Sequence, residues 1–117
     1  MARILMVEDN DLVAEALSEA LSRAGHNVDH SITPGGATHR IVRNSYDLVL
    51  MDLALPEYDG DKLAAEMRDV GFAGPIIALT GGLLTIDKEL AERANFAAVL
   101  RKPILPDDLV AAVDQFL

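Results

Sequence analysis

Three carboxylates and one ammonium in this sequence stand at the ends of apolar runs. Glu8 and Asp9 follow one such run. Asp52 closes a second, and Lys102 follows a third. Apolar runs of this length, with helical patterns between them, are typical of parallel strands. Open parallel sheets bind ligands outside the carboxyl ends of their strands, so we expect these side chains to meet at one edge.

Carboxylates held together in this way repel one another, and each raises the pKa of its neighbours. A divalent cation, together with the ammonium of Lys102, would relieve that repulsion. The four side chains therefore predict a site that binds a metal ion and a phosphoryl group.

Strands and helices are expected to alternate along the whole chain. The expected strands cover 3–7, 27–31, 47–51, 75–79 and 97–101. Helices are expected over 11–24, after Thr33-Pro34, up to Gly71, over 86–94 with Thr85 as a cap, and from Pro106 onward. This alternation predicts an α/β fold with a doubly wound, five-stranded parallel sheet and helices on both faces. The flavodoxin-like strand order 2-1-3-4-5 would place the first and third strands, and hence the acids, side by side.

The ends of several elements have recognisable signals. Asn10 is expected to cap the first helix, and Gly25 stands where a C-terminal glycine belongs. The polar strand 27–31 is expected at the edge of the sheet. The inner face of the last helix is expected to carry Leu109, Val110, Val113, Phe116 and Leu117.

The composition sets limits on the class of protein. The chain has 117 residues, the length of one domain, and half of them are hydrophobic. Cysteine is absent, which excludes disulfides and thiolate metal sites and fits a cytoplasmic location. No apolar stretch approaches the roughly 20 residues that span a bilayer, so no membrane partner is expected. The net charge of −9 argues against direct binding of nucleic acid.

A wider pattern appears when these residues are taken in order. The chain resembles the receiver domain of two-component response regulators over essentially its full length, 1–117. The shared elements are Val7-Glu8-Asp9, the stretch from Met51-Asp52 through Ala54 and Pro56 to Asp59-Gly60, Thr80, and Lys102-Pro103. Each element alone is weak, but their joint occurrence at successive strand ends is specific.

The resemblance implies a role for each site residue. Asp52 resembles the phosphoacceptor, because a carboxylate can act as a nucleophile and form an aspartyl phosphate. Asp9 and Asp52 would bind Mg²⁺ directly, with the carbonyl of Ala54 as a third ligand and Glu8 acting through water. Lys102 resembles the lysine that contacts the phosphoryl oxygens.

Two further expectations come with the resemblance. Thr80 resembles the switch hydroxyl, which would donate to a phosphoryl oxygen. The peptide bond between Lys102 and Pro103 is expected to be cis.

Taken singly, the same residues have simpler interpretations. Asp52 could cap a turn, and the charges of Glu8 and Asp9 could stabilise the start of the next helix. Lys102 could be an ordinary solvated lysine, and Thr80 could fill a strand end.

One position departs from the family pattern. Val99 stands where the family usually has an aromatic residue that moves together with the switch hydroxyl. We expect the activation signal to travel differently, through reordering of the loop 81–84. In that loop, Leu83 and Leu84 either form part of a partner-docking surface or fold back onto the core. His26, His30 and His39 have no metal-ligand spacing, and we assign them no role.

The predicted function is that of a phosphoacceptor response regulator. It would take a phosphoryl group from a phosphohistidine of a sensor histidine kinase or histidine phosphotransferase, and signal by altered binding to a downstream protein target. It would not be an enzyme beyond self-phosphorylation and slow self-dephosphorylation. One alternative is a degenerate receiver that binds proteins independently of phosphorylation. Another is a small-molecule phosphatase of the haloacid-dehalogenase type, which would need a second Asp where this chain has Ala54.

Overall fold

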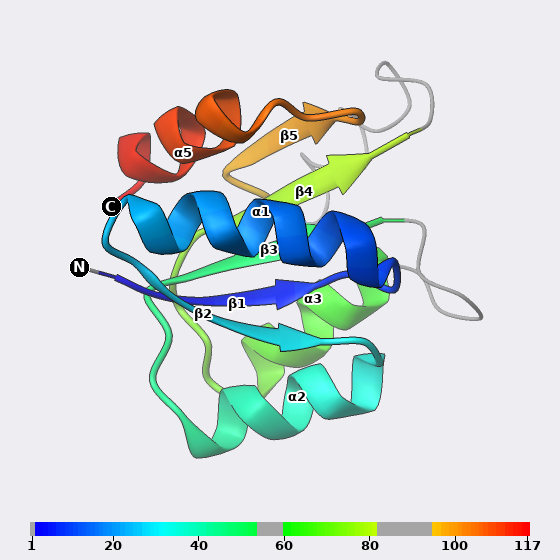
Figure 1. Ribbon diagram of the computed structural model, residues 1–117. Helices are drawn as coiled ribbons and strands as arrows, with labels where there is room; N and C mark the ends of the chain where they lie inside the picture. Colours follow the sequence, from blue (N-terminus) through cyan, green and yellow to red (C-terminus); the bar gives the residue numbers. More distant parts are fainter. Residues whose placement is uncertain (1, 54–59, 82–94) are drawn as a thin grey trace.

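The computed structural model describes residues 2–53, 60–81 and 95–117. It contains one five-stranded sheet, in which every pairing is parallel and the order is β2-β1-β3-β4-β5 (Figure 1). The strands are β1 (Arg3–Val7), β2 (Asn27–Ser31), β3 (Leu48–Asp52), β4 (Ile76–Thr80) and β5 (Ala98–Arg101). The helices are α1 (Asp11–Arg23), α2 (Pro34–Arg43), α3 (Gly60–Asp69) and α5 (Pro106–Gln115). The predicted fold class and strand order are confirmed, whereas the helix expected over 86–94 lies outside the described residues.

Two helical layers enclose the sheet. Helices α1 and α5 cover one face, and α2 and α3 cover the other (Figure 1). The α1/α5 core is built from Ala2, Ile4, Met6, Ala14, Leu17, Leu21, Leu48, Leu50, Ile77, Leu79, Leu109 and Val113. The α2/α3 core is built from Leu5, Val7, Ala37, Ile41, Tyr46, Val49, Met51, Leu63, Ala64, Met67, Phe72 and Ile76. Because helices cover both faces, β3 and β4 are fully buried, which explains why each strand is apolar up to its last residue.

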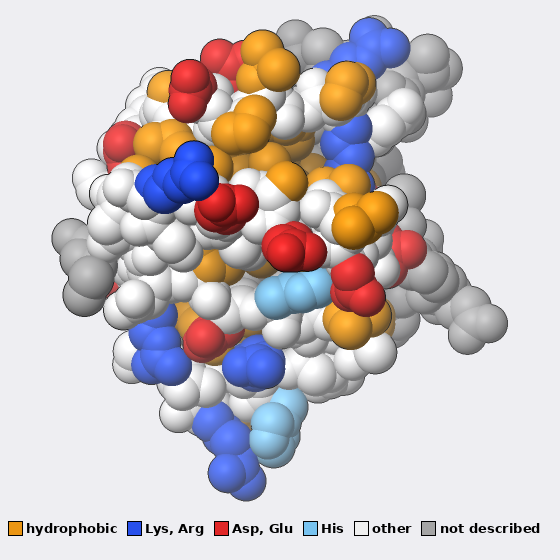
Figure 2. All heavy atoms as spheres, in the orientation of Figure 1, with side chains coloured by type: hydrophobic (Ala, Val, Ile, Leu, Met, Phe, Trp, Pro, Cys, Tyr) orange, Lys and Arg blue, Asp and Glu red, His pale blue; other side chains and the backbone are white. Residues whose placement is uncertain are grey.

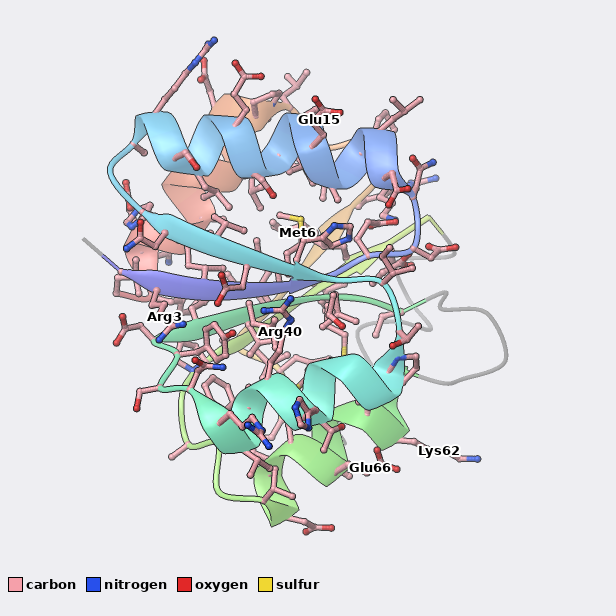
Figure 3. All side chains as sticks on the ribbon, turned by 60° about the horizontal axis from the view of Figure 1, so that its bottom comes forward. Arg3, Met6, Glu15, Arg40, Lys62 and Glu66 are labelled. Carbon is pink, nitrogen blue, oxygen red and sulfur yellow. The ribbon has the colours of Figure 1, made fainter. Side chains whose placement is uncertain are left out.

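Helix α1 has one apolar and one acidic face. Figure 3 shows Met6 pointing from the sheet toward α1, where its sulfur lies 3.8 Å from the hydroxyl oxygen of Ser18. The outer face carries Asp11, Glu15 and Glu19, and Figure 2 shows acidic side chains following this helix across the surface. The spacing of four residues explains the row, since residues four apart lie on the same side of a helix.

The expected helix ends are present. The side-chain oxygen of Asn10 accepts hydrogen bonds from the backbone N–H groups of Leu12 and Val13. Gly25 follows α1 with a φ of 94°, in the left-handed region that favours glycine. At the start of α2, the Thr33 hydroxyl accepts from the N–H of Gly36, and this cap offsets the poor helix propensity of two successive glycines.

Fewer residues of the last helical segment face the core than predicted. Leu109 and Val113 are fully buried, and Val110 and Phe116 pack against the α1/α5 core. Leu117 is 50% exposed, so its expected place on the inner face was wrong. The helix ends at Gln115, and the helical spacing that aims Leu109 and Val113 inward therefore does not extend to this residue.

No helix in residues 2–53, 60–81 or 95–117 has the length and apolar character that crossing a bilayer requires.

Candidate functional site

The sheet brings the predicted site residues to its carboxyl edge. Glu8 and Asp9 follow β1 directly, and Asp52 is the last residue of β3, the strand next to β1. Thr80 is the last residue of β4, and Lys102 follows β5 directly. All five parallel strands point toward this edge (Figure 1). Ala54, the expected backbone ligand, lies outside the described residues.

The three carboxylates form one cluster. One oxygen from each of Glu8, Asp9 and Asp52 lies within 4.8 Å of the corresponding oxygens of the other two. Glu8 and Asp52 are 1% and 2% exposed, whereas Asp9 is exposed to solvent. Oxygen ligands from carboxylates suit a hard divalent cation, and Asp9 leaves the cluster open to water. The cluster could therefore hold Mg²⁺.

Lys102 spans the two buried acids. Its Nζ donates to Oε2 of Glu8 at 2.8 Å and lies 3.1 Å from Oδ2 of Asp52. Its backbone N–H donates to the carbonyl of Thr80 at 2.6 Å, which ties the end of β5 to the end of β4. The predicted cis peptide between Lys102 and Pro103 is confirmed.

Burial and the neighbouring charges shift the pKa values of Glu8 and Lys102. Burial raises the pKa of the Glu8 carboxyl, and the charge of Asp52 adds to this rise against the lowering effect of the Lys102 hydrogen bond. Burial alone would lower the pKa of Lys102, but its hydrogen bonds and ion pairs with Glu8 and Asp52 outweigh burial and raise it. Lys102 therefore stays an ammonium, and Glu8 takes up a proton more readily than a solvated glutamate does.

The family model for the response regulator receiver domain matches residues 4–114, a range that contains every residue of this cluster. The chain belongs to the response regulator receiver domain family. Members of this family are signalling domains of two-component systems rather than enzymes in the ordinary sense, and they interact with histidine kinases and phosphotransferases.

Individual relatives support this assignment. The response regulator receiver protein CpdR of Brucella abortus is 31% identical over 117 residues, covering 100% of this chain and 98% of that protein. The transcriptional regulatory protein DltR of Streptococcus agalactiae is 33% identical over 111 residues, covering 95% of this chain but only 50% of DltR. This receiver domain thus spans about half the length of DltR.

Among solved structures, the chemotaxis protein CheY4 of Vibrio cholerae has a TM-score of 0.92 at 24% identity. The match covers 100% of this chain and 99% of CheY4. At this identity the likeness shows the shared fold.

One residue beside the receiver's acidic cluster was missed by sequence analysis. Nε2 of His30, on β2, lies 2.6 Å from the backbone carbonyl oxygen of Glu8. From the sequence, His30 could be placed only near the end of an edge strand, and nothing pointed to a contact with Glu8. Its contact depends on the register that pairs His30 with Met6, which one sequence does not give.

Of the positions considered for the activation switch, Thr80 and Val99 are among those that the structure describes. Thr80 is 3% exposed, and Val99 on β5 is half-buried, in register with Ala78 of β4. The residues 82–84, where we expected a reordering loop and the Leu83-Leu84 pair, lie outside the described residues.

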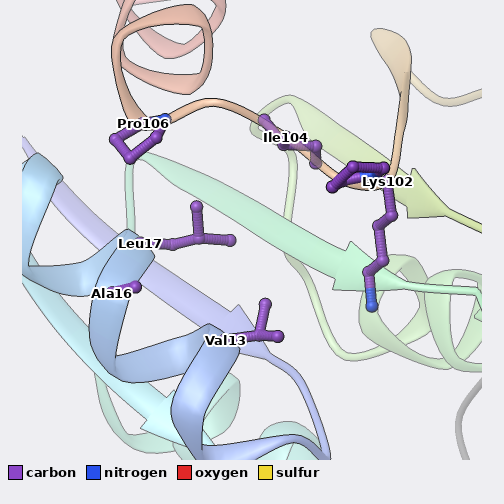
Figure 4. A pocket seen from close by; sticks show the side chains of 7 residues that line it. Val13, Ala16, Leu17, Lys102, Ile104 and Pro106 are labelled. Atoms are coloured by element: carbon purple, nitrogen blue, oxygen red, sulfur yellow. The ribbon is translucent and has the colours of Figure 1, made fainter.

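An apolar groove adjoins the site. It has a volume of about 450 Å³ and lies between α1 and the segment joining β5 to α5. Its lining residues are Val13, Ala16, Leu17, Lys102, Pro103, Ile104 and Pro106 (Figure 4). Figure 2 shows hydrophobic side chains gathered on the surface between α1 and α5. The stem of Lys102 therefore borders the groove, while its ammonium reaches the acids.

Proposed function

We propose that residues 1–117 act as one receiver domain whose Asp52 accepts a phosphoryl group from a phosphohistidine, and that the modified state binds a downstream protein differently. The observation that carries this proposal is the position of Asp52. Its carboxylate is almost fully buried at the end of β3, beside two other acids and 3.1 Å from the ammonium of Lys102.

Asp9 and Asp52 would hold Mg²⁺ directly, with the carbonyl of Ala54 as a further ligand and Glu8 acting through water. The ion would supply positive charge that offsets the negative charge of the phosphoryl oxygens. The fit rests on three carboxylate oxygens that converge within 4.8 Å and would otherwise repel one another.

The chain's own side chains account for the transfer step. A carboxylate oxygen of Asp52 attacks phosphorus, the bond from phosphorus to the donor's imidazole nitrogen breaks, and that nitrogen keeps the electron pair. The product is an acyl phosphate on Asp52. Lys102 exchanges its contacts with the carboxylates for contacts with phosphoryl oxygens, and the Thr80 hydroxyl donates to another of them.

The phosphodonor would dock beside the groove between α1 and α5. A helix with an apolar face fits such a groove. Two exposed leucines are chain neighbours of its lining residues: Leu12, 78% exposed, precedes Val13, and Leu105, 67% exposed, stands between Ile104 and Pro106. Docking there places the donor's histidine next to Lys102 and the acidic edge. The position of this groove beside Lys102 supports a histidine kinase or histidine phosphotransferase as the partner.

Treatment with acetyl phosphate and Mg²⁺, followed by mass spectrometry of the intact protein, tests the proposal. We expect one labile phosphoryl group on the wild type and none on Asp52→Asn. Asp69→Asn, which changes an exposed acid at the far end of α3, is the matched control and should be labelled normally. A wild type that takes up no phosphoryl group and no beryllofluoride would instead be an interaction module independent of phosphorylation.

A further inference from the structure

His30 makes an unusual contact from the edge strand. Its Cα is paired with Met6 of β1, yet its ring extends along β1 and reaches the carbonyl oxygen of Glu8. A carbonyl oxygen only accepts hydrogen bonds, so the imidazole carries its proton on Nε2 and donates. The distance of 2.6 Å is that of a short hydrogen bond.

This bond continues the attachment of β1 to β2 beyond the end of the strands. The N–H of Glu8 donates to the carbonyl of Ser31 at 3.2 Å, and β2 ends at Ser31. The imidazole of His30 then holds the carbonyl of the same residue, Glu8. Both backbone polar groups of Glu8 are thus tied to the edge strand.

The carbonyl that His30 holds belongs to the peptide group joining Glu8 to Asp9. The side chains on either side of this peptide are two of the three carboxylates in the acidic cluster. Fixing the plane of that peptide limits the directions in which both carboxylates can leave the backbone.

The other contacts of Glu8 use its carboxylate. Oε1 accepts from the N–H of Asn10 at 3.3 Å, and Oε2 accepts from Lys102 at 2.8 Å. A bound cation and its water molecules would compete with Asn10 and Lys102 for these oxygens. The bond from His30 uses no carboxylate lone pair, so it can persist whether or not a cation is bound.

We propose that His30 is a positioning residue for the divalent-cation site, and that it acts by holding the peptide group between Glu8 and Asp9. The inference rests on the proposed function of the acidic cluster. Removing a group that holds a metal ligand by a hydrogen bond, without touching the metal, typically weakens metal affinity by about 10- to 100-fold.

Two substitutions separate the hydrogen bond from the bulk of the ring. His30→Leu removes the donor, and His30→Gln restores an N–H at nearly the reach of Nε2. In calorimetric Mg²⁺ titrations at about pH 8, we expect an affinity about tenfold weaker for His30→Leu and within about threefold of the wild type for His30→Gln. His39→Leu, at an exposed histidine of α2, is the matched control and should bind Mg²⁺ as the wild type does.

A second readout distinguishes positioning from a merely structural role. In amide NMR spectra recorded without Mg²⁺, the signal of Asp9 should shift in His30→Leu and return toward its wild-type position in His30→Gln. If His30→Leu only lowers the melting temperature while its Mg²⁺ affinity stays that of the wild type, the inference is wrong. Should His30→Leu fail to fold, His30→Asn, whose shorter amide does not reach Glu8, replaces it in the comparison.

The two proposals can fail separately. If the wild type and His30→Leu bind Mg²⁺ equally and both take up beryllofluoride at Asp52, the positioning role falls and the proposed function stands. If the wild type binds neither Mg²⁺ nor beryllofluoride, both fall.

Discussion

Lys102 supplies the positive charge that lets Glu8 and Asp52 lie together inside the protein. Its ammonium contacts both carboxylates, at 2.8 and 3.1 Å, and its side chain is only 25% exposed. Buried charges are costly unless they are paired, so removing this ammonium would take away the positive charge that contacts both acids. A divalent cation bound to the same cluster would reduce the same repulsion between the carboxylates.

Lys102→Met should destabilise the protein by about 1–3 kcal/mol at neutral pH, because it leaves buried acceptors without their charged donor. Millimolar Mg²⁺ should recover part of this loss in urea denaturation, since the cation replaces the missing charge. Lys62→Met is the control, because Lys62 points away from the sheet on α3 (Figure 3). Equal stability of Lys102→Met and the wild type without Mg²⁺ would contradict this account.

The raised pKa of Glu8 predicts how Mg²⁺ binding depends on pH. Burial and the neighbouring Asp52 raise this pKa above the ordinary value of 4.5, so Glu8 takes up a proton at a higher pH than a solvated glutamate. A proton on Glu8 removes a negative charge that attracts the cation and the water molecules bound to it. Mg²⁺ affinity should therefore fall as the pH is lowered from about 8 to about 5.

Calorimetric titration across that pH range measures the effect, and Glu8→Gln is the variant to compare. This substitution removes the titrating group, so it should flatten the part of the profile that lies above pH 4.5. A Mg²⁺ affinity that rises as the pH falls would contradict the predicted direction of this pH dependence.

At the scale of single residues, the predicted positions of the site residues agree with the structure where a strand end fixes the residue's place. Glu8, Asp9, Asp52 and Lys102 could be predicted because each stands at or just after the end of an apolar run, and parallel strands share one carboxyl edge. His30 could not be predicted, because its hydrogen bond depends on the register between β1 and β2 and on a side-chain rotamer.

At the scale of elements, the start of α3 constrains the end of β3. A Cβ added to Gly60 would lie 2.8 Å from Cδ2 of Leu53, 3.1 Å from its Cα and 3.3 Å from the carbonyl oxygen of Asp52. Helix α3 thus begins directly against the backbone that carries the proposed phosphoacceptor. A side chain at this position would push on that backbone.

Gly60→Ala should therefore cost about 1–3 kcal/mol of unfolding free energy, despite the better helix propensity of alanine. Gly35→Ala, in the first turn of α2, is the control because a Cβ there meets nothing within 4 Å. That control should be neutral or stabilising by up to about 1 kcal/mol. Urea denaturation measures the stability of both variants. Equal stabilities of Gly60→Ala and Gly35→Ala would show that the backbone at the end of β3 moves to accept the new Cβ without loss of stability.

The elements themselves were largely predictable, and their exact limits were not. Asn10, Thr33 and Gly25 marked helix ends through capping chemistry that acts over a few residues. The third strand was expected to end at Met51 but includes Asp52, because its pairing with β4 continues to Leu79. Such limits depend on a neighbouring strand, and a strand pattern alone does not contain that information.

At the scale of the whole molecule, the sheet separates two cores. Ile4 lies in the α1/α5 core and Ile76 lies in the α2/α3 core, and both side chains are fully buried. They come from β1 and β4, which are not adjacent in the sheet. Substitutions that share no packing partners usually have additive effects on stability.

Ile4→Val and Ile76→Val should each cost about 0.5–1.5 kcal/mol, and the double variant should cost their sum within about 0.5 kcal/mol. Chemical denaturation of the four proteins completes the cycle. Ile4→Val combined with Leu17→Val, which changes the same core, is the comparison in which coupling is expected. A coupling above about 1 kcal/mol across the sheet would show that the two layers do not respond independently.

His26 holds both ends of the described fold at the edge opposite the acids. Its Nδ1 accepts from the N–H of Ala2 at 3.2 Å, and its Nε2 lies 3.0 Å from a carboxylate oxygen of Asp114 near the end of α5. Figure 1 shows the two ends on the side away from the strand tips. Fluorescent reporters or surface tethers attached at either end would therefore leave the reactive edge open, which suits this domain to single-molecule recording.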